Sequence, residues 1–352
     1  MKKIAVGMSG GVDSSVAALL LKKQGFDVFG LFMKNWQDDS PDCSSKKDFE
    51  DVQRVCEKID IPYYTINFEK EYFENVFQKC LTDFENGITP NPDVLCNKEI
   101  KFNLFLKKAL MLGADFLATG HYSQNKIIDK KNHLLKSDDL SKDQSYFLYT
   151  LKSTILEKVI FPIGHLKKNE VRKIAKENNL PTFDKKDSTG ICFIGERKFT
   201  DFLMNFIQTK PGPIKSIETQ ENLGKHIGLS FYTIGQRKGL KIGGRGDAWF
   251  VVDKNIKDNI LYVSQGEKSS YLYKNNLTAK NLSWVDESFK IKLPFKCSAK
   301  IRYRQNDQPC TIEKIEDGNV FVSFDSHQRA ITKGQAIVFY IDSVCLGGAE
   351  II

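Results

Sequence analysis

A turn rich in glycine and serine lies near the start of the chain. It reads Ser-Gly-Gly-Val-Asp-Ser-Ser at residues 9–15, after an apolar run at 4–8 and before a helical pattern that ends at Gly25. Gly10 and Gly11 allow a tight turn and a close approach of the backbone to a ligand, because glycine has no Cβ. Free amide groups at a helix start, together with serine hydroxyl groups, bind anions. The turn therefore predicts a phosphate-binding loop; a capped helix start without a ligand is the simpler alternative.

Two further segments carry cysteines in surroundings that favour reactive thiols. Residues 89–97, Thr-Pro-Asn-Pro-Asp-Val-Leu-Cys-Asn, form a loop that two prolines stiffen. If a helical turn starts at Asp93, then Asp93 and Cys96 share one face, and a position near a helix N-terminus favours the thiolate. Residues 187–197 place Cys192 among basic side chains, which lower a thiol pKa. Each cysteine alone also fits a buried structural residue, whereas the pair on one nucleotide-binding domain points to catalysis.

Basic and aromatic residues gather in the second half of the chain. They lie at 232–243, Tyr-Thr-Ile-Gly-Gln-Arg-Lys-Gly-Leu-Lys-Ile-Gly, and at 300–305, Lys-Ile-Arg-Tyr-Arg-Gln. Small β-barrels with such side chains on one face often hold RNA through its backbone. The formal net charge of +8 fits a polyanionic partner. A solvated basic face is the alternative, but two such segments after a nucleotide-binding domain favour RNA.

The elements that must position these residues form an α/β domain. Strands expected at 4–8, 27–33, 63–68 and 115–119 alternate with amphipathic helices, which predicts a doubly wound parallel sheet. Ligands of such sheets bind beyond the carboxyl ends of the strands. Polar clusters at 33–36 and 119–122 therefore join the turn at 9–15 on one edge of the sheet.

The pattern changes near residue 210. Before it, a polar hairpin is expected at 125–136 and a helix at 167–179; after it come short alternating runs, the first at 231–234, that predict two small β-barrels. We expect domains at residues 1–207, 208–272 and 273–352.

The composition excludes several classes of protein. The chain has 352 residues, 41% hydrophobic and 27% charged, as in an ordinary globular protein of two or three domains. Its eight cysteines include no Cys-x-x-Cys pair, which argues against a zinc site or a disulfide scaffold and favours a reduced, cytoplasmic protein without a structural metal. The first residues predict strand and loop instead of a signal peptide, and no apolar run is long enough for a membrane span.

The chain resembles the bacterial tRNA-specific 2-thiouridylases, which put sulfur on carbon 2 of the wobble uridine of tRNA. Matching motifs extend over essentially the whole chain, at 7–14, 33–36, 89–97, 118–122, 142–148, 188–197 and 235–240. The glycine loop alone is similar to the pyrophosphate loop of asparagine, GMP and NAD synthetases, whereas the two cysteine segments together are specific to the 2-thiouridylases. The chain departs from the family pattern at Ile88, Lys241 and Lys333, which replace a common Arg, Gly and Pro, and in a short loop at 244–249.

The resemblance implies an ATP pyrophosphatase domain (PP-loop, adenine nucleotide alpha hydrolase-like) followed by two β-barrels, with roles for the matching positions. ATP binding is implied for Gly7, Met8, Ser9, Gly10, Gly11, Val12, Asp13, Ser14, Met33 and Gly120. Contact with the target base is implied for Asn91, Pro92 and Asp93, and contact with tRNA for His121, Lys142, Asp143, Gln144, Arg302, Tyr303 and Gln335. Cys96 matches the nucleophile, Cys192 the persulfide carrier and Asp93 a general acid–base; the two cysteines would form a transient disulfide.

The implied reaction joins nucleotide chemistry to sulfur transfer. AMP is transferred to O2 of the uridine, Mg²⁺ and the loop amides hold the departing pyrophosphate, and sulfur replaces the activated oxygen. The implied partners are tRNAs for Lys, Glu and Gln and an upstream persulfide donor, such as a cysteine desulfurase or a sulfur relay protein. Three alternatives stay open: an adenylating amidotransferase-like enzyme, a non-catalytic RNA-binding or redox-sensing protein, and an iron–sulfur cluster on Asp93, Cys96 and Cys192 as the sulfur carrier.

Overall fold

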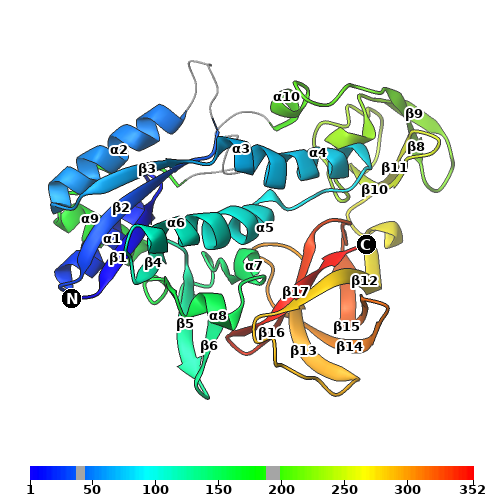
Figure 1. Ribbon diagram of the computed structural model, residues 1–352. Coiled ribbons are helices and arrows are strands. Elements are labelled where there is room, and N and C mark those ends of the chain that lie inside the picture. The colour runs from blue at the N-terminus through cyan, green and yellow to red at the C-terminus, as the bar shows by residue number, and fades with distance from the viewer. Residues whose placement is uncertain (37–43, 188–198) are drawn as a thin grey trace.

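A parallel sheet of five strands organises the first half of the molecule (Figure 1). The computed structural model describes residues 1–36, 44–187 and 199–352. The strands, in the spatial order β3-β2-β1-β4-β7, are β3 (Tyr63–Asn67), β2 (Asp27–Lys34), β1 (Lys3–Met8), β4 (Phe116–Thr119) and β7 (Val159–Ile160). The predicted α/β domain is confirmed; the two-residue strand β7 was not predicted.

Helices cover both faces of this sheet because its buried strands are apolar on both sides. One face packs on α1 (Val12–Lys23), α2 (Ser44–Ile59) and α9 (Lys168–Glu177). The other packs on α3 (Glu69–Tyr72), η1 (Phe73–Phe77), η2 (Cys96–Phe105) and α6 (Leu106–Met111). The short helices α4 (Gln78–Glu85), α5 (Pro92–Leu95), α7 (Ser145–Leu148), α8 (Ser153–Leu156) and α10 (Phe199–Leu203) complete the described set. No helix in the described ranges is long and apolar enough to cross a membrane.

The sheet order creates a crevice at the ends of β1 and β4. The chain leaves β1 toward β2 on one side, whereas β4 lies on the other side of β1. Such a reversal of strand order is where doubly wound sheets bind their ligands. The turn at 9–15 and the cluster at 119–122 both lie at this point.

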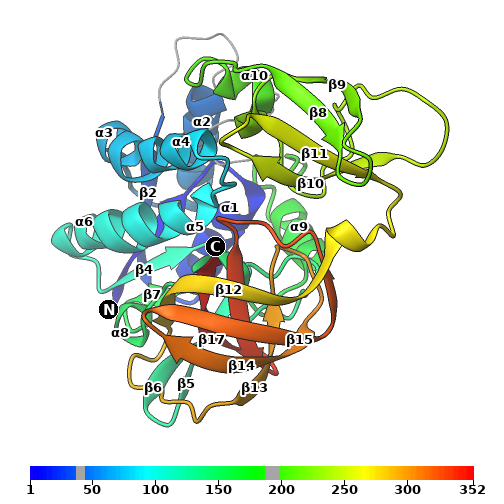
Figure 2. The ribbon, with the colours of Figure 1, turned by 90° about the vertical axis from the view of Figure 1, so that its right-hand side faces the viewer.

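A small sheet with the order β10-β11-β8-β9 follows (Figure 2). Its strands are β8 (Gly212–Ser216), β9 (Asn222–His226), β10 (Trp249–Asn255) and β11 (Ile260–Gln265). The strand expected at 231–234 is wrong: the chain instead makes a 3₁₀ turn, η3 (Leu229–Phe231). Phe231 and Tyr232 are both buried, which a strand with one exposed face does not allow, and Gly235 adopts a φ of 82° just beyond them.

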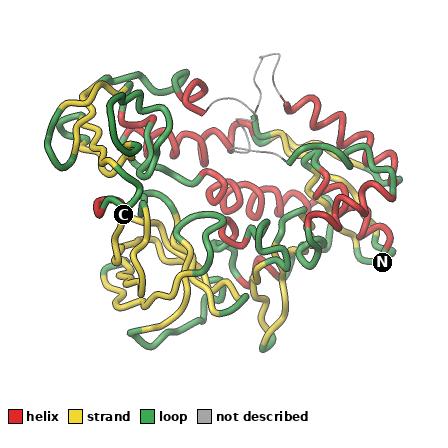
Figure 3. The backbone as a smooth tube through the Cα atoms, turned by 180° about the vertical axis from the view of Figure 1, so that it is seen from behind, coloured by secondary structure: helices red, strands yellow, loops and turns green. Residues whose placement is uncertain are grey.

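The last domain is a closed barrel of six strands, β12-β15-β14-β13-β16-β17, closed by pairing of β12 with β17. They are β12 (Tyr273–Trp284), β13 (Phe295–Lys300), β14 (Gln308–Glu316), β15 (Asn319–Arg329), β16 (Ala336–Ile341) and β17 (Val344–Ile351), with the 3₁₀ turn η4 (Ser270–Leu272) before β12. The expected hairpin is present as β5 (Ser123–Ile128) and β6 (Lys131–Lys136). It is less polar than expected, because Leu134 and Leu135 are buried and pair with β17, so that the α/β domain adds two strands to the sheet of the barrel. Seen from behind, the barrel consists mainly of strands and loops, whereas most of the helices lie in the α/β domain (Figure 3).

Candidate active site

The turn at residues 9–15 joins β1 to α1 and is held in shape by its own hydroxyl groups. Ser14 Oγ donates to the Gly11 carbonyl at 3.1 Å and Ser15 Oγ donates to the same oxygen at 2.8 Å. Ser9 N donates to Ser14 Oγ at 3.2 Å. Gly11 is the N-cap of α1 and supplies no side-chain hydrogen bond, so the helix start keeps amide groups for an external anion.

Two glycines let neighbouring segments close on this turn. Gly10 has a φ of 74°, and a Cβ there would lie 2.5 Å from the carbonyl oxygen of Asp48 on α2. A Cβ on Gly120 would lie 2.7 Å from the backbone nitrogen of Ser14. The loop after β4 therefore touches the first turn of α1, and Met33 lies at the same edge, near the end of β2. The structure thus gathers the residues that the sequence predicts for ATP binding.

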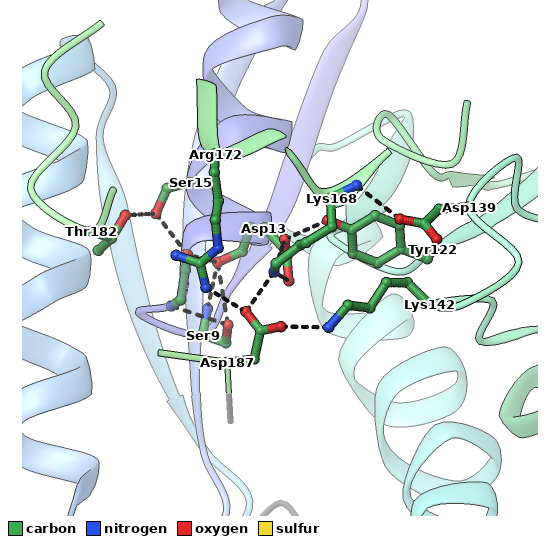
Figure 4. A network of polar contacts seen from close by, with 12 residues as sticks. Ser9, Asp13, Ser15, Tyr122, Asp139, Lys142, Lys168, Arg172, Thr182 and Asp187 are labelled. Atoms are coloured by element: carbon green, nitrogen blue, oxygen red, sulfur yellow. Dashed lines mark hydrogen bonds and ion pairs between the residues drawn. The ribbon is translucent and has the colours of Figure 1, made fainter. Parts of the chain in front are cut away.

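A network of ion pairs lies on the α9 side of the turn (Figure 4). Lys168 Nζ donates to Asp13 Oδ1 at 2.7 Å and to Oδ2 at 2.8 Å, and the Tyr122 hydroxyl donates to Oδ1 at 2.8 Å. Lys168 Nζ also pairs with Asp187 Oδ1 at 2.8 Å. Asp13 is thereby fixed by two side chains from outside the turn.

Two more cations reach Asp187. Lys142 Nζ lies 2.7 Å from Asp187 Oδ2, and the Arg172 guanidinium lies 2.8 Å from Oδ1. Burial alone would raise the pKa of Asp187, but hydrogen bonds from Lys142 and Lys168 lower it to about 2. Sequence reasoning missed Lys168 and Arg172. Their spacing of four residues at the start of an amphipathic helix was the available signal, because it places both on one face.

A helix begins within the segment at 89–97, at Pro92, one residue before the start at Asp93 that was considered from the sequence. Asn91 caps α5 by accepting a hydrogen bond from Val94 N at 3.3 Å, and Cys96, the first residue of the π-helix η2, is 1% exposed. Burial raises the pKa of the Asp93 carboxyl, and the charge of Lys101 offsets part of this rise. Asp93 is therefore a better proton donor near neutral pH than an ordinary carboxyl group.

The C-terminal barrel holds the start of this segment. Gln335 Nε2 donates to the carbonyl oxygens of Thr89 and Pro90 at 3.0 and 3.1 Å. Thr89 N donates to the Lys333 carbonyl at 3.0 Å, and a Cβ on Gly334 would lie 2.8 Å from Thr89 O. Gln335 thus contacts the loop that carries the predicted base-binding residues.

His121 and Lys101 link the two parts of the site. His121 Nδ1 is 2.7 Å from Thr119 Oγ1, and Nε2 is 3.5 Å from Lys101 Nζ on η2. Burial and the charge of Lys101 lower the pKa of His121 well below its usual range. His121 is therefore neutral at pH 7. The charge of Lys101 lowers the pKa of both His121 and Asp93.

The other residues matched to tRNA contacts differ in how accessible they are. The carboxylate of Asp143 is buried against Lys300 Nζ at 3.2 Å, and Gln144 Oε1 accepts a hydrogen bond from Tyr122 N at 2.9 Å. Arg302 is exposed, two residues beyond the end of β13. Tyr303 packs on Phe147 with ring centroids 4.6 Å apart.

Cys192, with residues 188–198, lies outside the described residues, so its predicted closeness to Cys96 remains a prediction. Cys56 and Cys80 are core thiols: they are 0% and 2% exposed, and burial raises the pKa of each to about 12.

Three family profiles match consecutive parts of the chain. A tRNA methyl transferase HUP domain matches residues 2–196, and a tRNA methyl transferase PRC-barrel domain matches residues 200–265. An aminomethyltransferase beta-barrel domain matches residues 274–351.

Curated proteins match the chain over almost its whole length. A protein of Protochlamydia amoebophila named tRNA-specific 2-thiouridylase MnmA is 56% identical over 353 residues, covering 99% of this chain and 93% of that protein. A protein of the same name from Oceanobacillus iheyensis is 55% identical over 353 residues and covers 99% of this chain and 94% of its own. Another, from Francisella philomiragia, is 55% identical over 357 residues and covers 99% of both chains.

Proposed function

Since the chain belongs to the tRNA-specific 2-thiouridylase family, we propose that it converts the wobble uridine of tRNA into 2-thiouridine at the expense of ATP. It is a tRNA sulfurtransferase that releases AMP and pyrophosphate, and we place it in the cytoplasm. The observation that carries the proposal is identity of 56% extending over 99% of the chain. The turn at 9–15 lies at the edge of the parallel sheet, and Lys101 on η2, the helix that begins at Cys96, lies 3.5 Å from His121 at the same edge, which supports the proposal.

We assign the activation step to the crevice between β1 and β4. The amide groups at the start of α1 would hold the phosphates, and Gly120 and Met33 would border the nucleotide. Transfer of AMP to O2 of the uridine turns a poor leaving group into a good one. The pyrophosphate that departs then remains beside the amide groups of Gly10 and Gly11.

We assign the sulfur step to Cys96 and Cys192. The Cys96 thiolate would attack the inner sulfur of a persulfide on Cys192, releasing hydrosulfide and leaving a Cys96–Cys192 disulfide. Hydrosulfide then attacks carbon 2 and AMP departs, while an external thiol reduces the disulfide. Asn91, Pro92 and Asp93 would hold the base, and the raised pKa of Asp93 supports a role in proton transfer.

We propose that tRNA is held mainly by exposed basic side chains, of which Arg302 on the domain at 273–352 is the best placed. Tyr303 follows Arg302 in the chain, and its hydroxyl donates to the Lys142 carbonyl at 3.4 Å; the side chains of Lys142 and Tyr303 are both partly exposed. The buried side chains of Asp143 and His121 would contribute by holding their loops in place. We also propose that the first domain ends at residue 207 and the second at residue 272. The substrates proposed are the tRNAs for Lys, Glu and Gln, and an upstream persulfide donor would supply the sulfur.

The residues present suit Mg²⁺ that arrives with ATP. Within the described ranges no group of three or more His, Cys, Asp or Glu side chains is arranged to hold a metal ion, and Asp13 is engaged by Lys168. Mg²⁺ usually binds through substrate phosphates and few carboxylates, where it neutralises phosphate charge. For an iron–sulfur cluster, two of the three candidate ligands, Asp93 and Cys96, are described, and visible absorption of anaerobically purified protein tests that alternative.

The test is sulfur transfer by the purified protein. Unmodified tRNA is incubated with ATP, Mg²⁺ and a persulfide donor, and mass spectrometry of the digested tRNA measures 2-thiouridine. The wild type should form it together with AMP, whereas Cys96→Ser and Cys192→Ser should not, although both should still bind tRNA. Cys56→Ser is the control, because Cys56 is a buried thiol on α2, outside the proposed chemistry.

Two results would overturn the assignment. ATP–pyrophosphate exchange without tRNA and without dependence on either cysteine would indicate an amidotransferase-like enzyme. Absence of any ATP turnover in the presence of tRNA would indicate a non-catalytic RNA-binding protein. Full thiolation by Cys192→Ser would remove the persulfide role alone.

A further inference from the structure

Two cysteines lie opposite each other on neighbouring strands of the C-terminal barrel. Cys297 on β13 pairs in register with Cys310 on the antiparallel strand β14, and their Sγ atoms are 3.7 Å apart. Both are free thiols. They share the inner face of the barrel with Ala299 and Ile312, because side chains two residues apart in a strand point to the same side.

The pairing of the two strands suits a disulfide at this position. Residues directly opposite each other on antiparallel strands have Cα atoms about 4.5–5.5 Å apart, which lies within the range of about 4.4–6.8 Å found across disulfides. The two sulfur atoms must approach each other to about 2 Å, and rotation about the Cα–Cβ bonds supplies a movement of this size. The bond can therefore form while β13 and β14 stay paired.

The two thiols differ in their access to solvent. Cys297 is partly exposed, whereas Cys310 is 3% exposed. The hydrogen bond with Cys297, together with burial, raises the pKa of the Cys310 thiol above its usual range. An external reagent therefore meets Cys297 first. Once Cys297 has reacted, the main cause of the raised pKa of Cys310 is removed, and Cys310 becomes the better nucleophile of the two.

We propose that Cys297 and Cys310 form a redox modification site that low-molecular-weight disulfides oxidise, with Cys297 as the attacking thiol and Cys310 as the resolving thiol. The Cys297 thiolate attacks one sulfur of the reagent, which gives a mixed disulfide and releases one thiolate. Cys310 then attacks Cys297 Sγ, and the second reagent thiolate departs with the proton of Cys310. In sum, two protein thiols lose two electrons and become one disulfide, while the reagent is reduced to two thiols.

The disulfide would enclose the loop between β13 and β14. This loop contains Arg302 and Tyr303, for which contact with tRNA is proposed above. Closing a ring over residues 297–310 restricts the unfolded chain, so the oxidised barrel should be more stable than the reduced barrel. The site itself needs neither ATP nor tRNA and is independent of the proposed function.

The experiment treats the full chain with glutathione disulfide, blocks the remaining thiols with N-ethylmaleimide and maps unreduced peptides by mass spectrometry. The wild type should give a peptide pair linked through Cys297 and Cys310. Cys310→Ala should keep glutathione on Cys297, whereas Cys297→Ser should carry none on Cys310. Cys56→Ser is the control, because Cys56 is buried on α2 in another domain, and this variant should form the link as the wild type does.

Thermal unfolding of the same samples measures the effect on stability. Oxidation should raise the unfolding midpoint of the barrel by about 4 °C or more in the wild type but not in Cys297→Ser, and a reducing agent should reverse the rise. An unchanged or lowered midpoint in protein that carries the link would overturn the claim that the folded barrel accommodates the bond.

Absence of the linked peptide pair from folded, treated wild type would overturn the proposal. Linkage of Cys297 mainly to a cysteine other than Cys310 would do the same, and glutathione on Cys310 of Cys297→Ser would refute the assigned order of attack. If Cys310→Ala does not fold, the wild-type map and Cys297→Ser, which changes a partly exposed position, carry the test. A protein that forms this disulfide but no 2-thiouridine would uphold the site while the proposed function fails.

Discussion

The substitution Asp143→Asn tests whether Asp143 stabilises the fold or contacts tRNA. The carboxylate is 1% exposed and lies 3.2 Å from the ammonium group of Lys300, whose side chain is 8% exposed. It also accepts hydrogen bonds from the backbone nitrogens of Ser137 and Ser145, at 3.2 and 3.1 Å. Asp143 follows the β5–β6 hairpin, whereas Lys300 ends β13 of the barrel, so the pair joins the two domains.

The expected loss in the free energy of unfolding depends on which buried charge each substitution leaves without its partner. Removing one partner of a buried ion pair costs about 3–5 kcal/mol, because the other charge stays buried. Lys300 keeps a second carboxylate, Asp307, at 3.9 Å, so we expect the lower end, about 3 kcal/mol, for Asp143→Asn. Lys300→Met should cost about as much, and the double variant should be more stable than the sum of both losses predicts, by at least about 1 kcal/mol.

Urea unfolding followed by fluorescence measures these free energies, and filter binding measures tRNA affinity on the same samples. Asp129→Asn is the matched control, because it removes the same charge from an exposed hairpin turn and should change stability by less than about 0.5 kcal/mol. If Asp143→Asn stayed as stable as the wild type but bound tRNA more weakly, the reasoning from burial would be refuted. The direct contact implied by the resemblance would then be the better explanation.

Three other substitutions have defined outcomes. Gly120→Ala should abolish ATP binding measured by titration, because the added Cβ would lie 2.7 Å from Ser14 N, whereas Gly243→Ala, with nothing within 4 Å, should bind like the wild type. Asp93→Asn should lose thiolation but have a larger free energy of unfolding than the wild type at pH 7. Burial raises the pKa of Asp93 in the folded protein, so the wild type loses stability as the pH rises from the unfolded-state pKa to the folded-state pKa of this carboxyl group. The variant has no carboxyl group at this position and does not lose this stability. Unfolding curves at pH 4 and pH 7 check this sign, and a variant less stable than the wild type at pH 7 would contradict it. Gln335→Ala should lower kcat for thiolation by up to about 100-fold with little change in KM for tRNA, whereas a raised KM alone would indicate direct RNA contact.

The sequence predicts the α/β domain well because its signals are local. Apolar runs such as 4–8 are buried on both faces of the sheet, and each is followed by a helix with its own periodicity. The turn at 9–15 is predicted for the same reason: two glycines and three hydroxyl groups act on a backbone only a few residues long. The start of α5 at Pro92, one residue before the start considered at Asp93, also has a local cause, since proline suits the first turn of a helix.

What the sequence does not show depends on residues far apart in the chain. Lys168 is 155 residues from Asp13 in the chain, and the sequence around either residue does not predict their ion pair. The run at 231–234 alternates like a strand, but its aromatic side chains are both drawn into the core of the small sheet. The joining of β6 to β17 needs a partner strand more than 200 residues away, which no local pattern identifies.

Asp143 and Gln335 together change the role that the barrel plays in the proposed reaction. Both were matched to tRNA contacts, yet Asp143 is bonded to Lys300 of the barrel and Gln335 is bonded to Thr89 and Pro90 of the cysteine segment. A barrel that served only to bind RNA would need neither bond. Because both bonds join the barrel to the α/β domain, tRNA bound to the barrel, as proposed, would act on the loop that leads to Cys96, the proposed nucleophile. Substitutions at this contact should therefore affect the rate of sulfur transfer before they affect the affinity for tRNA.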